Sequence, residues 1–246
     1  MILASCGSGV QRDGPAWNAA RTSADGRSIL LVFTGGAEFD PADPCTNQYR
    51  ADVDEADSAV TIGLVAIEPP DRLPQPADTE IACAALGYPR ELTVDLDEPL
   101  GERQLIDART GITRPPFDGA GLLHPGWIPD GWIFLGEGMA FPDGDTSQTW
   151  SQGWGALSSD NIACPAFALM QGTPEAMNAS DPFGFDTPIG TYDVNGSTAV
   201  HATTAQRFHE RLTWTRGDVS ISVIATSCEA GSVEPDSLLT FARSIE

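Results

Sequence analysis

Four cysteines, spread along most of the chain, are the residues whose chemistry is easiest to infer. They are Cys45, Cys83, Cys164 and Cys228. A thiolate can bind a metal ion or form a disulfide, and zinc sites usually bring ligands together in closely spaced pairs. These cysteines form no CxxC pair and have no histidine nearby, so their spacing argues against a metal site. In an exported protein they allow three disulfide pairings, whereas in the cytosol they would remain buried thiols.

The fifth cysteine, Cys6, lies in a short motif near the amino terminus. Residues Leu3-Ala4-Ser5-Cys6 resemble the lipobox of bacterial lipoproteins, in which an aliphatic and two small residues precede an invariant cysteine. The resemblance implies cleavage before Cys6 and a diacylglyceryl group on its sulfur. The basic and apolar regions of a secretory signal do not precede the motif, which indicates a late start at Met1 or a trimmed chain. The alternative is a chance match and a free thiol.

A lipid on Cys6 would place the chain on the outer face of the bacterial cytoplasmic membrane. One acyl chain anchors a protein only marginally, whereas two hold it durably. Because exported proteins meet an oxidising compartment, we expect the other four cysteines to form disulfides. The pairing Cys45–Cys83 with Cys164–Cys228 keeps each bridge within one predicted domain.

The histidines and carboxylates form no pattern that indicates catalysis. A serine or cysteine nucleophile needs a neighbouring base, but the sequence has no GxSxG motif, and His124, His201 and His209 are scattered. The 35 acidic residues allow so many pairs that none is singled out for glycoside hydrolysis. We therefore expect neither enzymatic activity nor a cofactor.

Two aspartate-rich segments contain oxygen ligands that Ca²⁺ prefers. They are residues 40–43 (Asp-Pro-Ala-Asp) and 143–145 (Asp-Gly-Asp). Neither has the spacing and closing glutamate of an EF-hand. Aspartate is also common in tight turns, so we expect turns here and no bound metal.

The charge of the chain excludes one large class of partner. The 246 residues have a formal net charge of −22, and both halves are acidic: residues 1–116 contain nine arginines against nineteen acids, and residues 117–246 four against sixteen. Nucleic acids are bound largely through lysines and arginines that neutralise phosphates, so we expect no nucleic acid partner. No apolar run is long enough for a membrane-spanning helix.

The sequence predicts three segments. Residues 1–26 hold the lipobox motif and a stretch rich in Gly, Ser, Ala, Asp and Arg without apolar periodicity, which is typical of a flexible tether. Trp17 is the one large apolar residue of this stretch, and the sequence leaves open whether it docks on the folded body or stays in the tether. Residues 27–114 form a disulfide-stapled β domain, and residues 115–246 form an α+β domain. The boundary falls after Arg114 because Pro115 and Pro116 interrupt both helix and strand.

Short β-branched runs separated by Gly, Pro and Asp predict strands in the first domain. The predicted strands are Ile29–Thr34, Ala59–Ile67, the alternating stretch Leu92–Leu96, and Gln104–Ala108. Together with Tyr49–Val53 and residues 94–103 (Val-Asp-Leu-Asp-Glu-Pro-Leu-Gly-Glu-Arg), these features resemble a small β domain of exported actinobacterial lipoproteins. That resemblance covers residues 28–113 and implies no catalytic residues.

The second domain is predicted to be an antiparallel sheet followed by a helix. Its predicted strands are Thr149–Gly155, Ala163–Met170, Thr198–Ala202, Glu210–Thr215 and Val219–Thr226. Arg216-Gly217-Asp218 supplies a turn between the last two, which accounts for this tripeptide without a role in adhesion. Ser232 and Pro235 predict the start of a helix whose apolar face includes Leu238 and Phe241. This order resembles the half-barrel of LolA-type carriers and extracytoplasmic sensor domains.

Four tryptophans in the second domain are the candidate ligand-binding aromatics. They are Trp127, Trp132, Trp150 and Trp154. Tryptophans can bind a glycan, a protein or an apolar molecule in a half-barrel, but they also fill ordinary cores. Overall, the sequence predicts a mainly β or α+β protein, a lipid-anchored, non-catalytic binding or sensing module. The alternatives are a structural component of a cell-envelope complex and an exported hydrolase that uses carboxylates.

Overall fold

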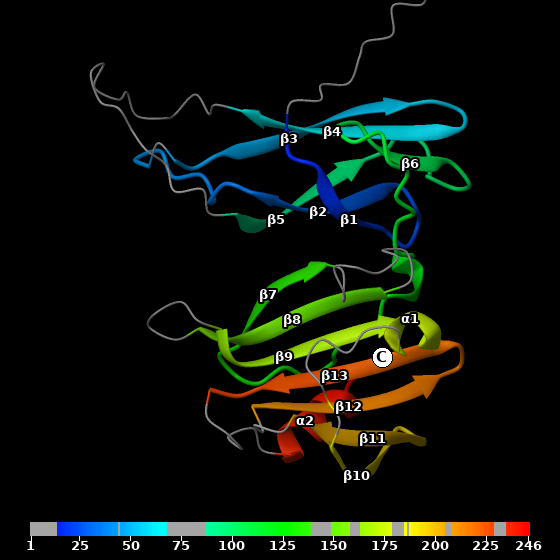
Figure 1. Cartoon of the computed structure of the whole chain (residues 1–246). Coiled ribbons are helices and arrows are strands. Elements are labelled where there is room, and N and C mark those ends of the chain that lie inside the picture. Colours follow the sequence, from blue (N-terminus) through cyan, green and yellow to red (C-terminus); the bar gives the residue numbers. More distant parts are fainter. Residues whose placement is uncertain are drawn as a thin grey trace, which may run out of the picture. The chain divides into compact units, whose positions relative to one another are not determined.

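The chain is folded into two compact units, each built around β-sheets (Figure 1). The computed structural model describes residues 14–43, 45–67, 87–138, 149–157, 163–178, 185, 187–204, 208–228 and 235–246. The units are Met1–Ala120 and Gly121–Glu246. The division therefore lies a few residues after the predicted boundary at Arg114. A 3-10 turn, η1 (Gly119–Gly121), lies at this point of the sequence.

The first unit contains two three-stranded sheets that share one core. Its strands are β1 (Trp17–Thr22), β2 (Ser28–Gly35), β3 (Gln48–Glu55), β4 (Ala59–Ile67), β5 (Tyr88–Asp95) and β6 (Gln104–Asp107). One sheet has the order β1-β2-β5 and is antiparallel throughout. The other has the order β3-β4-β6, in which β3 and β4 are antiparallel and β4 and β6 are parallel.

Alternating apolar residues make these sheets pack face to face. Ile29, Leu31 and Phe33 on β2 are buried, and their neighbours along the strand are more accessible. Val60 and Ile62 on β4 are likewise fully buried in the same core. Because side chains alternate between the faces of a strand, one apolar face of each sheet is removed from water. The sequence predicts both of these strands, β2 as Ile29–Thr34 and β4 as Ala59–Ile67.

The prediction of a flexible tether up to residue 26 is wrong for its last part. Residues 17–22 form β1, which pairs with β2. Trp17 is 0% exposed, and its indole nitrogen donates a hydrogen bond of 3.3 Å to the backbone oxygen of Ile62. The sequence gives a weak strand signal here because Trp17 is followed mainly by small side chains. Residues 1–13, including Cys6, lie outside the described residues.

The second unit is one open antiparallel sheet of seven strands in the order β10-β11-β12-β13-β9-β8-β7. The strands are β7 (Ile133–Gly138), β8 (Thr149–Leu157), β9 (Ala163–Gly172), β10 (Thr187–Val194), β11 (Ser197–Thr203), β12 (His209–Arg216) and β13 (Val219–Thr226). The helices within the described residues of this unit are α1 (Pro174–Asn178) and α2 (Pro235–Arg243). The predicted fold class, mainly β with antiparallel sheets and a C-terminal helix, is confirmed.

Helix α2 covers one face of the seven-stranded sheet. Its apolar residues Leu238, Phe241, Ala242 and Ile245 belong to one buried cluster with Leu212 and Trp214 of β12, Ile221 and Val223 of β13, and Phe167 and Leu169 of β9. The Phe241 ring lies 4.8 Å from the Phe167 ring, centroid to centroid. The expected helix is therefore present, whereas Ser232, its predicted first residue, lies outside the described residues.

The opposite face of this sheet carries a smaller apolar cluster. Met170, Phe185, Ala202 and Ile224 form this second cluster, and Met177 of α1 packs against it. Ser220 and Ser222 of β13 are also buried. The large apolar side chains are therefore concentrated on the α2 side.

Two hairpins of the sheet, β10–β11 and β12–β13, have turns that contain a glycine with positive φ. Gly217 has φ +60° between β12 and β13, in the predicted turn. Asn195 and Gly196 have φ 52° and 83° between β10 and β11, where both central residues need the left-handed conformation. The sequence prediction did not include β10, and it missed this hairpin.

Candidate binding site

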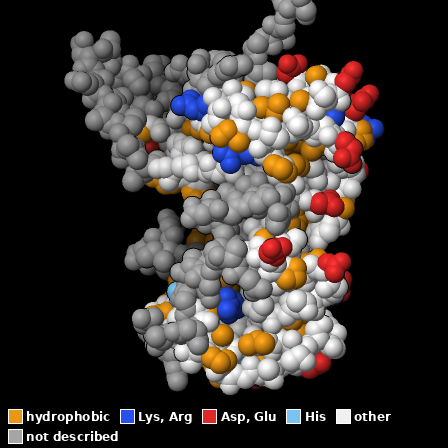
Figure 2. Space-filling view, turned by 45° about the vertical axis from the view of Figure 1, so that its right-hand side comes forward, with side chains coloured by type: hydrophobic (Ala, Val, Ile, Leu, Met, Phe, Trp, Pro, Cys, Tyr) orange, Lys and Arg blue, Asp and Glu red, His pale blue; other side chains and the backbone are white. Residues whose placement is uncertain are grey.

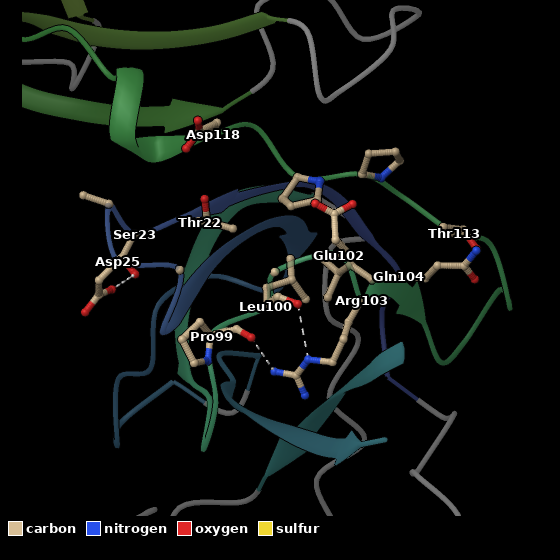
Figure 3. A pocket seen from close by; sticks show the side chains of 16 residues that line it. Thr22, Ser23, Asp25, Pro99, Leu100, Glu102, Arg103, Gln104, Thr113 and Asp118 are labelled. Carbon is tan, nitrogen blue, oxygen red and sulfur yellow. Dashed lines mark hydrogen bonds between the residues drawn. The ribbon is translucent and has the colours of Figure 1, made fainter. Parts of the chain in front are cut away.

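One feature of the first unit that could hold a ligand is a hollow of about 670 Å³ (Figure 3). Three loop segments line it: the β1–β2 turn (residues 22–26), the β5–β6 connection (residues 99–105), and residues 113–118. Small-molecule sites commonly have volumes of roughly 300–1,000 Å³. The hollow is therefore large enough for a small organic molecule.

Arg103 holds the β5–β6 connection in place. Its Nη2 atom donates to the backbone oxygens of Glu98, at 2.7 Å, and Pro99, at 3.0 Å. Its Nε atom donates to the backbone oxygen of Leu100 at 3.3 Å, and Nη1 donates to Glu55 Oε2 at 2.8 Å. A guanidinium can satisfy several acceptors in one plane, so a single side chain fixes the path of the whole loop.

Glu55, at the end of β3, is the anionic partner of Arg103. Its Oε1 atom also accepts a 2.8 Å hydrogen bond from the Asp97 backbone N–H. Burial alone would raise the pKa of Glu55, but the Asp97 N–H and the Arg103 guanidinium outweigh it and lower the pKa below its ordinary value. Glu55 is therefore a carboxylate at neutral pH, and its charge stabilises the loop.

The β1–β2 turn forms a second wall and is bonded to the first. Asp25 accepts hydrogen bonds from the Ser23 hydroxyl, at 2.7 Å, and from the Arg27 N–H, at 3.0 Å. These two donors, the hydroxyl first, lower the pKa of Asp25. The Leu100 N–H donates to the Gly26 backbone oxygen at 2.9 Å, so the two loops are linked through their main chains.

The third wall is held by residues far away in the sequence. The Phe117 N–H donates to the Ala20 oxygen at 2.8 Å, and the Thr22 N–H donates to the Phe117 oxygen at 3.0 Å. Gly119 packs so closely that a Cβ atom there would lie 1.8 Å from the Thr22 backbone oxygen. Only glycine fits this contact, which keeps residues 115–118 at the hollow.

The charges around the hollow are mainly negative. Asp25, Glu102 and Asp118 line it, and Figure 3 shows their side chains apart from one another. Arg103 is the arginine among the lining residues, and its guanidinium is engaged in the bonds above. Arg21 lies nearby, with Nη1 3.5 Å from the Thr22 oxygen. Acidic side chains also outnumber basic ones on the face seen in Figure 2.

The predicted disulfide Cys164–Cys228 is confirmed. It joins the start of β9 to the residues after β13, with a Cα–Cα distance of 5.5 Å. Cys45 is disulfide-bonded as well. Cys83, its predicted partner, and Cys6, the predicted lipid attachment site, lie outside the described residues.

The four candidate tryptophans do not form an exposed group. Trp150 and Trp154 are buried at 0% and 6% exposure, and the Trp132 ring lies 4.8 Å from Phe167. Trp127 is 37% exposed. The expectation of a half-barrel lined by aromatics is corrected for Trp150 and Trp154: Trp154 packs in the cluster under α2, and the Trp150 indole donates a 2.7 Å hydrogen bond to Glu137.

The three histidines each contact a different polar side chain, and they do not come together in one site. His201 Nε2 lies 3.1 Å from Glu210 Oε2, on the α2 side of the sheet. His209 Nδ1 lies 3.1 Å from the Thr226 hydroxyl, on the opposite face, because it is adjacent to Glu210 along β12. Burial lowers the pKa of His209. His124 Nδ1 lies 3.4 Å from Gln152 Nε2.

The described part of the aspartate-rich segments forms turns. Asp40 Oδ1 accepts a 2.8 Å hydrogen bond from the Ala42 N–H, and Asp43 Oδ1 accepts one of 2.8 Å from the Cys45 N–H. Residues 143–145 lie outside the described residues. Within the described ranges, no group of three or more His, Cys, Asp or Glu side chains could hold a metal ion. No helix in the same ranges is long and apolar enough to cross a membrane.

Sequence comparisons do not supply a family for this chain. A scan against protein-family models finds no match, and a search of curated proteins finds none either. The residues of the hollow were not predicted as a site, although Glu102 and Arg103 lie in the motif that carries the resemblance to the small β domain. Asp25 and Asp118 gave no signal, because each looks like an ordinary turn residue.

Proposed function

We propose that the protein is an extracytoplasmic lipoprotein, anchored through a lipid on Cys6, whose globular part binds a ligand without transforming it. The observation that carries the proposal is the Cys164–Cys228 disulfide. Disulfides persist in oxidising compartments and are rare in the cytosol of mesophiles, so a bridge supports export. The disulfide state of Cys45 supports it further.

A binding role is supported by how the hollow is built. Its walls are loops, yet each loop is tied by several hydrogen bonds to a strand or to another loop. Loops held on a rigid scaffold are where proteins usually place recognition residues. Such a site exists before its ligand arrives, which lowers the entropic cost of binding.

Intact mass spectrometry tests the anchor and the compartment together. The protein is expressed from its full upstream reading frame in a lipoprotein-processing bacterium and measured with and without reduction and alkylation. We expect a mature chain that begins at Cys6, carries a diacylglyceryl group, and has four further thiols blocked until reduction. The C6S variant is the control and must lack the lipid. A chain that retains Met1 and has five free thiols would overturn the proposal.

An exposed apolar strand favours one second candidate, a subunit of a cell-envelope complex. Strand β7 is the last strand in the sheet order, and Ile133, Phe134 and Leu135 are 47%, 46% and 39% exposed. Sheet edges with apolar side chains are sites of strand addition by a partner. Crosslinking of intact cells would distinguish this candidate: a discrete crosslinked species that disappears in the F134K variant supports it, and no such species argues against it.

A further inference from the structure

The turn between β10 and β11 contains the only Asn-Gly pair of the sequence, Asn195-Gly196. We propose that Asn195 is a site of slow, irreversible deamidation, and that this reaction releases the end of helix α2 from the turn. The inference concerns the second unit alone and does not depend on any ligand of the protein.

An asparagine followed by glycine can react with its own backbone. The backbone nitrogen of Gly196 loses its proton to hydroxide and attacks Asn195 Cγ, so a C–N bond forms and closes a five-membered ring. The bond between Cγ and Nδ2 breaks, and the nitrogen leaves as ammonia with a proton from water. Water then opens the ring at either carbonyl, which gives aspartate or isoaspartate. The step needs no oxidant or reductant, and glycine favours it because no Cβ atom shields the attacking nitrogen.

The fold holds both reacting groups in place. Asn195 has φ 52° and Gly196 has φ 83°, the left-handed pair that a two-residue hairpin turn requires. The Asn195 amide nitrogen donates a 2.9 Å hydrogen bond to the backbone oxygen of Arg243, the last residue of α2. The Gly196 N–H donates to Asp193 Oδ1 at 3.4 Å. The turn must therefore open before Asn195 reacts, which makes the reaction slow in the folded protein.

Arg243 bonds to the same turn a second time, through its side chain. Its Nε and Nη2 atoms donate to the Asp193 backbone oxygen at 3.1 and 3.0 Å. The end of α2 and the turn are thus joined in both directions, and each supplies a donor and an acceptor. Asp193, Asn195, Gly196 and Arg243 are all exposed, so water reaches the turn without unfolding of the core.

Deamidation changes the contact with α2 from attractive to repulsive. It replaces the amide donor by a carboxylate, which accepts hydrogen bonds but donates none. The new charge faces the Arg243 carbonyl, at the negative end of the α2 dipole, and lies on the same turn as the Asp193 carboxylate. The last turn of the helix therefore loses a donor. Because the ammonia is lost to solvent, the change persists.

The rate of the reaction is measured by incubating the oxidised, full-length chain in mildly alkaline buffer, with peptide mapping by mass spectrometry at intervals. The same chain unfolded in urea gives the rate without the turn. Asn18 is the internal control: it is also exposed and donates a 3.3 Å hydrogen bond to Thr34 Oγ1, but it precedes Ala19 in strand β1. The variant R243A removes the side-chain bonds to the turn and keeps the backbone oxygen that Asn195 binds.

We expect Asn195 to be converted in the folded chain while Asn18 stays unchanged. R243A should react roughly tenfold faster than the wild type, because the turn opens more easily without the hydrogen bonds from a charged group. The unfolded chain should react faster again. The inference fails if Asn195 is not converted in the folded chain, if Asn18 reacts as fast, or if the wild type, R243A and the unfolded chain react at one rate.

Hydrogen exchange tests the effect on α2. The probe is the Ser244 N–H, which donates to the Thr240 oxygen at 3.2 Å in the last turn of the helix. N195D carries the charge of the product, and N195G is the matched variant that keeps the left-handed turn without an amide. N195G should exchange roughly threefold faster than the wild type because one exposed hydrogen bond is lost, and N195D faster still. Wild-type exchange in N195D would show that the turn does not hold the helix.

Discussion

At the scale of single residues, Arg103 and Glu55 decide whether the site keeps its shape. The Arg103 side chain is 12% exposed and that of Glu55 is 19% exposed, so their ion pair is partly shielded from water. Ion pairs and hydrogen bonds in such places contribute more than those on the open surface, and losing one partner leaves the other unpaired. Three backbone oxygens of the loop also depend on Arg103.

We therefore predict that R103A lowers the free energy of unfolding of the first unit by about 2–3 kcal/mol, because several charge-assisted hydrogen bonds are lost. The free energy of unfolding of R103K should lie between those of R103A and the wild type, since an ammonium cannot reach all four acceptors. Denaturant unfolding under oxidising conditions measures both. Equal stability of R103A and the wild type would show that the loop does not need this side chain.

The lowered pKa of Glu55 gives a second prediction, for acid conditions. The folded protein binds this proton less readily than the unfolded chain, so the contribution of Glu55 is complete above its ordinary pKa in the unfolded chain and is lost as pH falls through its lowered pKa in the folded protein. The E55Q variant should lose stability at neutral pH and show a shallower loss of stability below about pH 4. Unfolding curves measured across this range, with D54N as a charge control, check the slope.

At the scale of elements, helix α2 is the part that gives the seven-stranded sheet its main core. Phe241 is 0% exposed and its ring lies 4.8 Å from Phe167 and 5.6 Å from Trp154. We predict that F241A destabilises the second unit by about 3–5 kcal/mol, because it creates a cavity among aromatic rings, and that F241L costs clearly less. Thermal unfolding followed by tryptophan fluorescence separates the two variants. Similar losses for both would contradict cavity formation.

The elements also show where the sequence was informative. Strands β2, β4 and β13 were predictable because apolar side chains recur along them with the right spacing and glycine or proline bounds them. β10 was missed because seven of its eight residues are exposed, so burial imposes no pattern on it. Its hairpin was nevertheless signalled by Asn195-Gly196, a dipeptide that the sequence analysis did not use as a turn.

The candidate site was harder to predict than the fold. Its walls come from three loops, and the bonds between them join residues as far apart as Thr22 and Phe117. Local periodicity carries no information about such contacts, since it describes only neighbours on one strand or helix. The tryptophans attracted attention through their size, but size favours the core, and that is where Trp150 and Trp154 lie.

At the scale of the whole molecule, disulfide bonds restrict a chain that has a large net negative charge. Self-repulsion at a net charge of −22 opposes a compact state. We predict that replacing both Cys164 and Cys228 by Ala lowers the free energy of unfolding by about 2–4 kcal/mol, because the bridge closes a long loop in the unfolded chain. The reduced wild type, measured by the same denaturant titration with salt added, should lose at least as much free energy of unfolding relative to the oxidised wild type. No difference between the oxidised and reduced protein would contradict this.

Because Trp17 is buried in β1, the segment that would link a lipid on Cys6 to the folded body is shorter than the sequence predicts. From Cys6 to the first residue of β1 there are eleven residue steps, and a fully extended chain advances at most about 3.6 Å per residue. With a lipid on Cys6, the β1 strand would stay within about 40 Å of the bilayer surface, whereas a tether up to residue 26 would allow nearly twice that distance. Such a body would meet ligands in the thin layer of solvent next to the membrane. The short linking segment would raise its encounter rate with ligands released from the membrane surface.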